Sequence, residues 1–456
     1  DEEGNVTWSS LEVFVRKEVT RETPKVVVVE GVNKTEQKPT RVGEESGEPL
    51  VLIEGDGNAD GSRRASLDMV LAPLDRPTAR KNKISQGLQA QVVCVVPGGG
   101  GDRLGLRKDD VILSVNKQEI HSSAELMRTL RQCTLGSPVE LEVLRDGEKR
   151  VLAGKYETTF STREAFHRIS DLAKTDAAAQ HALGAYYATG FGTNADLAQA
   201  AACYRNAADK GVVAAQRELG RCYLEARGLK KDDREAVTWF RRAADAGDFE
   251  SRRWLGSMYE RGAGVTKDLN EAKHLYTVAA KQGNALAMYD LGLMYANGKF
   301  GEPDWKEAGL WFHKAADQGL AEAQNWLGVL HQRGYGVDKD DARALEWFRK
   351  AAEQGEAHAE CSIGTTYAEG RGVDRDDKEA VAWYRKSAAH GNALGAFNLG
   401  TMYEQGRGID KNLELALESY RKAAAQGNDQ AKSAVARLDK STKRTSSSGS
   451  RLASVR

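Results

Sequence analysis

The chain has 456 residues, which is enough for two or three domains at the usual size of roughly 100 to 200 residues each. Its 66 basic residues balance its 66 acidic ones, so no global field favours binding to nucleic acid or to an acidic lipid surface. Apolar runs such as residues 26–29 are far shorter than the roughly 18 residues that a membrane-spanning helix needs, so we expect a soluble chain without a transmembrane segment.

The five cysteines are odd in number and show no C-x-x-C spacing, a pattern that favours neither a disulfide framework nor a zinc site. We therefore expect the cysteines to be small core residues. We expect the protein to lie in a reducing compartment, either the cytoplasm or the interior of an organelle such as a stroma or matrix. Cys203 and Cys222 are the pair that adjacent repeats could bring together. No metal site and no cofactor is predicted.

Residues 1–65 are predicted to form an acidic, partly extended segment that ends in a linker. Residues 1–62 carry 7 Lys/Arg against 14 Asp/Glu, and the run 55–64 consists mostly of Gly, Asn, Asp and Ser, which favour turns. Ser66 follows Arg63-Arg64-Ala65, the form that basophilic kinases favour, and a phosphate there would add about −1.5 to −2 of charge. Ser66 is therefore a candidate phosphosite, with a chance match as the alternative interpretation.

Residues 66–155 show the element order of a compact module. A buried strand at 90–96 leads through a Pro-Gly-rich turn to a second strand at 110–116. Ser122 and Ser123 then cap an amphipathic helix that runs to Arg131, and a hairpin turning at 145–147 ends the unit.

This order, together with the text G-L-R-K-D-D-V-I-L-S-V-N-K from Gly105 to Lys117, resembles a PDZ domain of the type carried by HtrA-like proteases. The resemblance covers residues 66–155 and implies a small α+β sandwich or barrel that binds an extended or C-terminal peptide as an added strand. It assigns the peptide groove to the loop residues Leu67, Asp68 and Met69 and to the helix residues Ser123, Met127 and Leu130.

Asp68 departs from the family pattern, since relatives usually have Gly at this place in the loop. A carboxylate there would repel the terminal carboxylate of a peptide, and a side chain removes the permissive backbone of glycine. We therefore expect an internal peptide, or the chain's own N-terminal strands, to occupy the groove in preference to a free C-terminus.

The same resemblance raises the question of protease activity. A serine protease needs an activated Ser with His and Asp partners, but no G-x-S-G string occurs and the eight histidines are scattered. We therefore expect that the chain is not an enzyme. The alternative is that it is the regulatory part of an HtrA-like protease whose catalytic domain precedes Asp1.

More than half of the chain consists of a sequence repeat with a period of 36 residues. The glycine of a Leu-Gly pair, or of Ile363-Gly364 in one copy, recurs at this step seven times without insertion, a signature of a solenoid. Each copy reads as two helices separated by a Gly-x-Gly turn, and Asp196, Asp232, Asp268, Asp304, Asp340 and Asp376 stand where second helices begin and should cap them.

The pattern A-x-x-x-L-G-x-x-Y-x-x-G-x-G-V, followed by D-x-x-x-A-x-x-W-Y-x-K-A-A-x-x-G, resembles the Sel1-like repeat, a relative of the tetratricopeptide repeat. The resemblance covers residues 179–430 and, with caps, 163–440. It implies an all-α, right-handed superhelical solenoid of seven helix-turn-helix repeats after the PDZ-like module. The two families together imply a multidomain scaffold.

Most aromatic residues of the repeats recur every 36 residues and are predicted to form the core of the stack rather than a base-stacking surface. Residues at register position 25 vary instead, and we interpret the four tryptophans there either as a partner-binding face or as packing between repeats. They are Trp239, Trp311, Trp347 and Trp383.

The tail, 441–456, is rich in Ser and Arg, and we expect it to be disordered.

The leading hypothesis is a non-catalytic adaptor that binds a peptide in the PDZ-like groove and a larger protein partner on the solenoid, in the assembly or quality control of a complex. A further alternative is an assembly factor at the surface of a membrane complex, with the basic tail as a peripheral tether.

Overall fold

The first part of the described chain is a small antiparallel sheet. The structure, a computed structural model, describes residues 69–73, 82, 90–95, 98–120, 126, 129–130, 133, 136–156, 162–190 and 192–452. The chain divides into two units, 1–46 and 47–456, and all described residues lie in the second. The groove residues Leu67, Asp68, Ser123 and Met127 and the candidate phosphosite Ser66 therefore lie outside the described residues.

The strands are short and rich in β-branched and other apolar residues, as a half-buried sheet requires. Their order in the sheet is β1-β2-β3-β5-β6, each neighbour pair being antiparallel, and β4 pairs with β3. The short helix α3, Gly100–Leu104, stands between β2 and β3 in the chain. The strands are β1 Met69–Pro73, β2 Ala90–Val95, β3 Val111–Val115, β4 Gln118–Glu119, β5 Pro138–Arg145 and β6 Glu148–Lys155.

The hairpin between β5 and β6 turns where the sequence predicted it. Asp146 and Gly147 have φ angles of 54° and 83°, the left-handed values that a two-residue hairpin turn needs. Alternate residues of β5, among them Leu141 and Val143, point into one buried cluster with Ile112 of β3. The module therefore has its own core, as the predicted PDZ-like fold requires.

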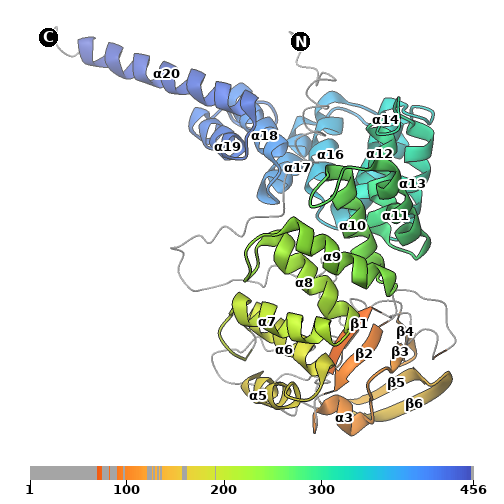
Figure 1. Ribbon diagram of the computed structural model, residues 1–456. Coiled ribbons are helices and arrows are strands. Elements are labelled where there is room, and N and C mark those ends of the chain that lie inside the picture. Colours follow the sequence, from red (N-terminus) through yellow and green to blue (C-terminus); the bar gives the residue numbers. More distant parts are fainter. Residues whose placement is uncertain are drawn as a thin grey trace. The chain divides into compact units, whose positions relative to one another are not determined.

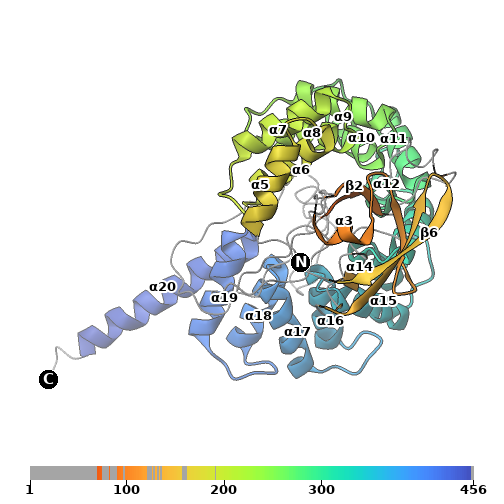
Figure 2. The ribbon, with the colours of Figure 1, turned by 90° about the horizontal axis from the view of Figure 1, so that it is seen from below.

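After the sheet, the described part of the chain is mainly helical as far as Leu452. Helix α5, Thr162–Leu172, precedes seven helix pairs, and α20, Asp429–Leu452, follows them. Figures 1 and 2 show consecutive pairs stacked side by side. We call the first helix of each pair the A helix: α6 Ala177–Thr189, α8 Val213–Glu225, α10 Phe249–Arg261, α12 Ala285–Ala296, α14 Ala321–Arg333, α16 Ala357–Glu369 and α18 Ala393–Gln405. The second is the B helix: α7 Leu197–Asp209, α9 Asp233–Asp245, α11 Leu269–Lys281, α13 Trp305–Asp317, α15 Asp341–Glu353, α17 Asp377–Ala389 and α19 Leu413–Ala425.

The Leu-Gly pair of each A helix is explained by the aromatic residue of the B helix that follows it. A Cβ at Gly220 would lie 2.8 Å from the ring of Phe240, and the equivalent glycines face equivalent rings in the other repeats. These B-helix rings are buried, which confirms the predicted core. The A-helix tyrosines, such as Tyr223, are only half-buried. Part of each side chain packs against a hydrophobic cluster, and the rest is exposed to solvent.

The predicted helix caps are confirmed. The six aspartates accept hydrogen bonds from backbone N–H groups in the first turn of their B helices, as Asp196 does from Ala198 and Gln199 at 3.0 Å. Asn412 does the same at the start of α19. The capping position is thus filled in all seven repeats.

Two turns depart from the glycine pattern in different ways. Ala226 keeps the left-handed conformation of the glycines that it replaces, with φ of 58°. In the fourth repeat α12 ends one residue early, and Asn297 at its C-cap has φ of −86°. Phe300 packs edge-on against Tyr295 at 5.4 Å, and the Lys273 ammonium lies 4.5 Å from the Phe300 ring. The local turn shape changes, but the helix pair is retained.

Helix α20 continues to Leu452, whereas the composition of residues 441–456 led us to expect disorder from Ser441 onward. Ala431, Ala434 and Leu438 hold its first half against α19. No proline interrupts the segment up to Leu452, so the backbone can extend a helix that is already anchored. The structure therefore assigns this segment differently from its composition.

Candidate functional site

Strand β1 is an edge strand of the described sheet. Among the described strands β1 pairs only with β2, and it stands at the end of the sheet order. A strand in this position presents unpaired backbone groups to which an extended peptide can add. The arrangement is therefore able to receive a peptide strand.

The two predicted groove residues that the structure describes both point into the core of the module. Met69 of β1 and Leu130 are each 1% exposed and belong to one cluster with Leu71 and Leu126. Leu126, Thr129 and Leu130 are helical, as predicted for this segment. These contacts bring β1 and the helix together, while the accessible lining of the groove stays a prediction.

A buried ion pair ties the strands of this module together. Asp110, fully buried at the start of β3, accepts hydrogen bonds from Nε and Nη2 of Arg145, both at 2.7 Å. The Nη2 atom of Arg145 also donates to the Gly105 carbonyl oxygen at 2.7 Å, and the bond to Asp110 raises the pKa of Arg145. This pair could not be predicted from the sequence, because its members are 35 residues apart and the pairing of β3 with β5 brings them together.

The four tryptophans at register position 25 share one local arrangement. Each lies on a B helix, and a Lys or Arg three residues later covers its ring, a favourable cation–π geometry. Trp239 is 5% exposed, while Trp311, Trp347 and Trp383 are half-buried. The distances to the ring centroids are 4.5 Å for Arg242, 4.0 Å for Lys314, 4.2 Å for Lys350 and 4.0 Å for Lys386. A partner-binding role for these rings stays a prediction.

A second contact repeats between neighbouring pairs. An arginine of a B helix donates to the hydroxyl group of the tyrosine 18 residues later, on the next A helix. At the end of the solenoid, Arg421 donates to the carboxylate of Asp439, also 18 residues later, at 3.1 Å. The C-terminal helix α20 thus makes the last contact of this series. The tyrosine pairs are Arg205 with Tyr223, Arg241 with Tyr259, Arg349 with Tyr367 and Arg385 with Tyr403.

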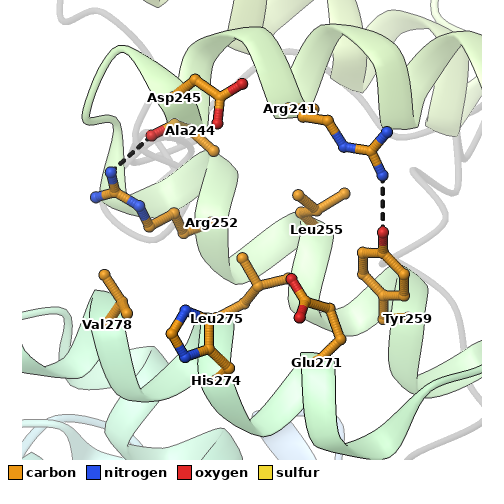
Figure 3. A pocket seen from close by; sticks show the side chains of 10 residues that line it. All are labelled: Arg241, Ala244, Asp245, Arg252, Leu255, Tyr259, Glu271, His274, Leu275 and Val278. Atoms are coloured by element: carbon orange, nitrogen blue, oxygen red, sulfur yellow. Dashed lines mark hydrogen bonds between the residues drawn. The ribbon is translucent and has the colours of Figure 1, made fainter.

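A pocket of about 400 Å³ opens between the B helices α9 and α11, above the A helix α10 (Figure 3). Its base is apolar and includes Leu255 and Leu275. On its rim, Nη2 of Arg241 donates to the Tyr259 hydroxyl group at 2.7 Å, which fixes both side chains. Figure 3 shows the Glu271 carboxylate beside them, facing the pocket. The site therefore combines an apolar base with a charged rim, as binding pockets commonly do.

A buried polar seam, which the sequence analysis missed, joins the A helices of the first repeats. Arg217 is 1% exposed, and its Nη1 atom lies 2.7 Å from Oδ1 of Asp248. Its Nε atom lies 3.3 Å from Oε2 of Glu250 and 3.4 Å from Oε1 of Glu218. His181 is fully buried nearby, and neither ring nitrogen has a hydrogen-bond partner among the described residues. Burial and the charge of Arg217 lower the pKa of His181 to about 3, so the ring is neutral.

The described residues set two limits on other kinds of site. No described helix combines the length and the apolar character that crossing a bilayer takes. Within the same residues, no three His, Cys, Asp or Glu side chains converge in a way that could hold a metal ion.

The fold and these surfaces define the class of the protein: a helical-repeat solenoid preceded by a PDZ-like module. A family model for the Sel1 repeat matches more than half of the chain, and the chain belongs to the Sel1 repeat family. A model for the PDZ domain matches residues 74–153. Both modules serve protein–protein interaction. The Sel1 matches cover residues 177–212, 213–248, 250–284, 285–320, 321–356, 357–392 and 393–428.

Similar structures are solenoids of the same repeat. The chain is 35% identical to a protective antigen present in uropathogenic Escherichia coli strains displaying an SLR fold, with a TM-score of 0.50, 62% of this chain and 61% of that one being covered. It is also 32% identical to a Sel1 repeat protein from Oxalobacter formigenes, with a TM-score of 0.49 over 60% of this chain and 80% of that one. The alignment to the antigen thus spans about three fifths of each chain.

One curated relative with similar sequence matches the PDZ region alone. It is a protein of Halomonas elongata described as a "probable periplasmic serine endoprotease DegP-like", 36% identical over 92 residues. These residues are 20% of this chain and 19% of the relative. The chain therefore matches about a fifth of that relative's length, which is the part that the PDZ resemblance accounts for.

Proposed function

We propose that the protein is a non-catalytic adaptor that holds an extended peptide on strand β1 and a larger protein partner on the Sel1 solenoid. The observation that carries this proposal is the presence, in one chain, of an open sheet edge beside a helix and of seven stacked helix pairs. Each surface suits a different kind of protein ligand, a strand at β1 and a folded or looped segment on the repeats. Assembly or quality control of a complex is the role that fits two simultaneous partners.

The peptide that binds at β1 is proposed to be an internal segment. Asp68 replaces the glycine that PDZ domains usually have at this point, and its carboxylate opposes a terminal carboxylate. Asp68→Gly should therefore raise the affinity for peptides with a free C-terminus relative to the same peptides with an amidated end. Fluorescence polarisation with one matched peptide pair measures this ratio, and an unchanged ratio would contradict the assignment.

The adaptor proposal is tested by affinity capture with the full chain and quantitative mass spectrometry. A partner should be enriched with the intact chain and lost when residues 177–428 are replaced by an unrelated Sel1 solenoid of the same repeat number. Such a replacement keeps the folded mass and the PDZ-like module. If no captured protein depends on these residues, the adaptor proposal fails.

A second candidate function is the regulatory part of a serine protease. Its support is the similarity of the PDZ region to a DegP-like protein. The full gene product should then react with a fluorophosphonate probe for serine hydrolases. A product that does not react leaves the adaptor as the function, whereas labelling of an attached domain makes the PDZ-like module its regulator.

We also propose a reducing compartment for the protein. All five cysteines are free, and burial raises the pKa of the Cys203 thiol to about 11 and those of Cys94, Cys222 and Cys361 to about 12. Trapping the native protein from cells with an alkylating agent should find all five thiols reduced.

A membrane-surface role is checked by removing residues 441–456, which should release the protein from the membrane fraction if the tail is a tether.

A further inference from the structure

The pocket between α9 and α11 lies where four other repeats place an indole ring of their own. Trp239, 36 residues before Leu275, packs in one cluster with Ala208, Leu219 and Tyr223. Adding 36 to these three positions gives Ala244, Leu255 and Tyr259, which line the pocket. The pocket is therefore the tryptophan site of the third repeat with leucine in place of the indole.

The same repeat also lacks the cation that covers the ring elsewhere. Position 28, three residues after the tryptophan, is Arg242 in the second repeat but Val278 in the third, and Val278 lines the pocket. Leu275 and Val278 are smaller than the pair that they replace, so the space above Leu255 stays open (Figure 3). A cavity of this size and lining can hold one aromatic side chain.

We propose that this pocket binds an aromatic side chain of a partner protein, and an indole in preference to a phenyl ring. The inference rests on the proposed function of the solenoid as a partner-binding surface, and it names the chemistry of that partner. The ring enters between α9 and α11 and packs on Leu255 and Leu275, as Trp239 packs on Leu219 one repeat earlier.

The rim supplies the polar contacts that an aromatic residue on a partner needs. The Glu271 carboxylate faces the pocket and can accept the N–H of an indole, which a phenyl ring lacks (Figure 3). Arg241 is exposed, donates a hydrogen bond to the hydroxyl group of Tyr259 and forms no ion pair with any described residue. Its remaining N–H groups are placed to donate to a backbone carbonyl beside the bound ring.

The proposal is tested with N-acetyl-tryptophanamide as the probe and N-acetyl-leucinamide as its aliphatic counterpart. In saturation-transfer NMR with the full chain, the tryptophan probe should give a signal several-fold stronger than the leucine probe. Leu275→Trp fills the pocket from within and should reduce the tryptophan signal at least five-fold. Leu310→Trp, which adds an indole on the 55% exposed Leu310 of α13, is the matched control and should leave it unchanged.

A second measurement does not depend on how the variants fold. In the wild-type chain, the methyl resonances of Leu255, Leu275 and Val278 should shift on addition of the tryptophan probe, while those of Leu310 should not. Equal signals for the two probes, or a tryptophan signal that persists in a folded Leu275→Trp variant, would overturn the pocket assignment. Sedimentation that shows a wild-type dimer dissociated by Leu275→Trp would replace the partner with a second copy of this chain.

Failure of this inference can be told apart from failure of the adaptor function. If affinity capture recovers a partner that depends on residues 177–428 and Leu275→Trp captures it equally well, the adaptor stands and the pocket is not its seat. If Leu275→Trp abolishes both probe binding and capture of that partner, the pocket is the partner's anchor point. If the probe binds at the pocket but no partner depends on residues 177–428, the adaptor function fails.

Discussion

Single residues in this protein take backbone or protonation states that their neighbours impose on them. Ala226 adopts a left-handed conformation at the C-terminus of α8, where five of the other A helices end on glycine. A side chain in this conformation costs roughly 1 to 2 kcal/mol, which a glycine avoids.

Ala226→Gly should therefore stabilise the protein by about 1 kcal/mol, because it removes this strain at an exposed position. Urea denaturation followed by circular dichroism measures the change. Ala246→Gly is the matched control, since Ala246 caps α9 with a φ of −74° and should lose stability. A loss of stability at both positions would mean that the left-handed turn is not strained.

His181 should make the first repeats sensitive to mild acid. Its pKa is about 3 in the folded chain against 6.5 for the unfolded histidine, so the unfolded state binds the extra proton as the pH falls below about 6.5. Stability is then lost by up to about 1.4 kcal/mol per pH unit, while above pH 6.5 this group has no effect. Thermal melts between pH 7 and 5 measure the slope.

The neutral variant His181→Gln should show a shallower slope over the same range, although it starts from a lower stability. His274, which is exposed on α11, provides the control, because His274→Gln should leave the slope unchanged. Identical slopes for the wild type and His181→Gln would contradict the role of the buried ring.

At the scale of elements, what repeats in the sequence could be predicted and what occurs once could not. The caps, the turns and the buried rings recur in seven copies, so each copy supported the interpretation of the others. The Arg217 seam occurs once, and its partner Asp248 is 31 residues away at the N-cap of the next A helix, α10. Its contacts depend on how one pair stacks on the next, which no periodic pattern specifies.

The same limit applies to the candidate sites. Position 25 could be recognised as variable from the sequence, but only the packing of Leu275 beside Ala244, Leu255 and Tyr259 identifies a pocket. In the PDZ-like module the strand–helix groove was predicted from a resemblance. Met69 of β1 and Leu130 of the helix were predicted to line this groove, but both side chains face the core. The apolar run of β1 is too short to show from the sequence which of its residues point inward.

The Asp110–Arg145 pair should be a principal support of the PDZ-like module. Asp110→Ala leaves the Arg145 guanidinium partly buried without its carboxylate and should destabilise this module by roughly 3 kcal/mol. The exposed pair of Lys149 with Glu142 lies on the same hairpin, and Lys149→Ala should cost less than about 1 kcal/mol. Hydrogen exchange at β3 and β5 measures both, and equal effects would contradict the prediction.

For the molecule as a whole, stability should depend on covering the last helix pair. Ala431, Ala434 and Leu438 of α20 pack against α19 in the same cluster as Ala416 and Tyr420. A solenoid needs such a cover, because each repeat buries its apolar face on a neighbour.

Truncation after Gly427 should therefore lower the melting temperature by several degrees, because it exposes this cluster. Truncation after Lys440 keeps the three packed side chains and should change the melting temperature by less than about 1 °C. Circular dichroism melts of both variants provide the comparison. A large loss after the second truncation would mean that residues 441–452 also support the solenoid.

The second glycine of the Gly-x-Gly turns has a mechanical consequence. A Cβ at Gly336 would lie 2.6 Å from the backbone carbon of Trp305, so main chain meets main chain at this edge of the stack. Beside this backbone contact the rings of Trp305 and Tyr335 stack with their centroids 4.6 Å apart. Position 25 lies further along the same B helix, where Trp311 follows Trp305 by six residues. A partner ring that enters beside Leu275 would move α9 and α11 apart at that point and so change the local pitch of the stack between them.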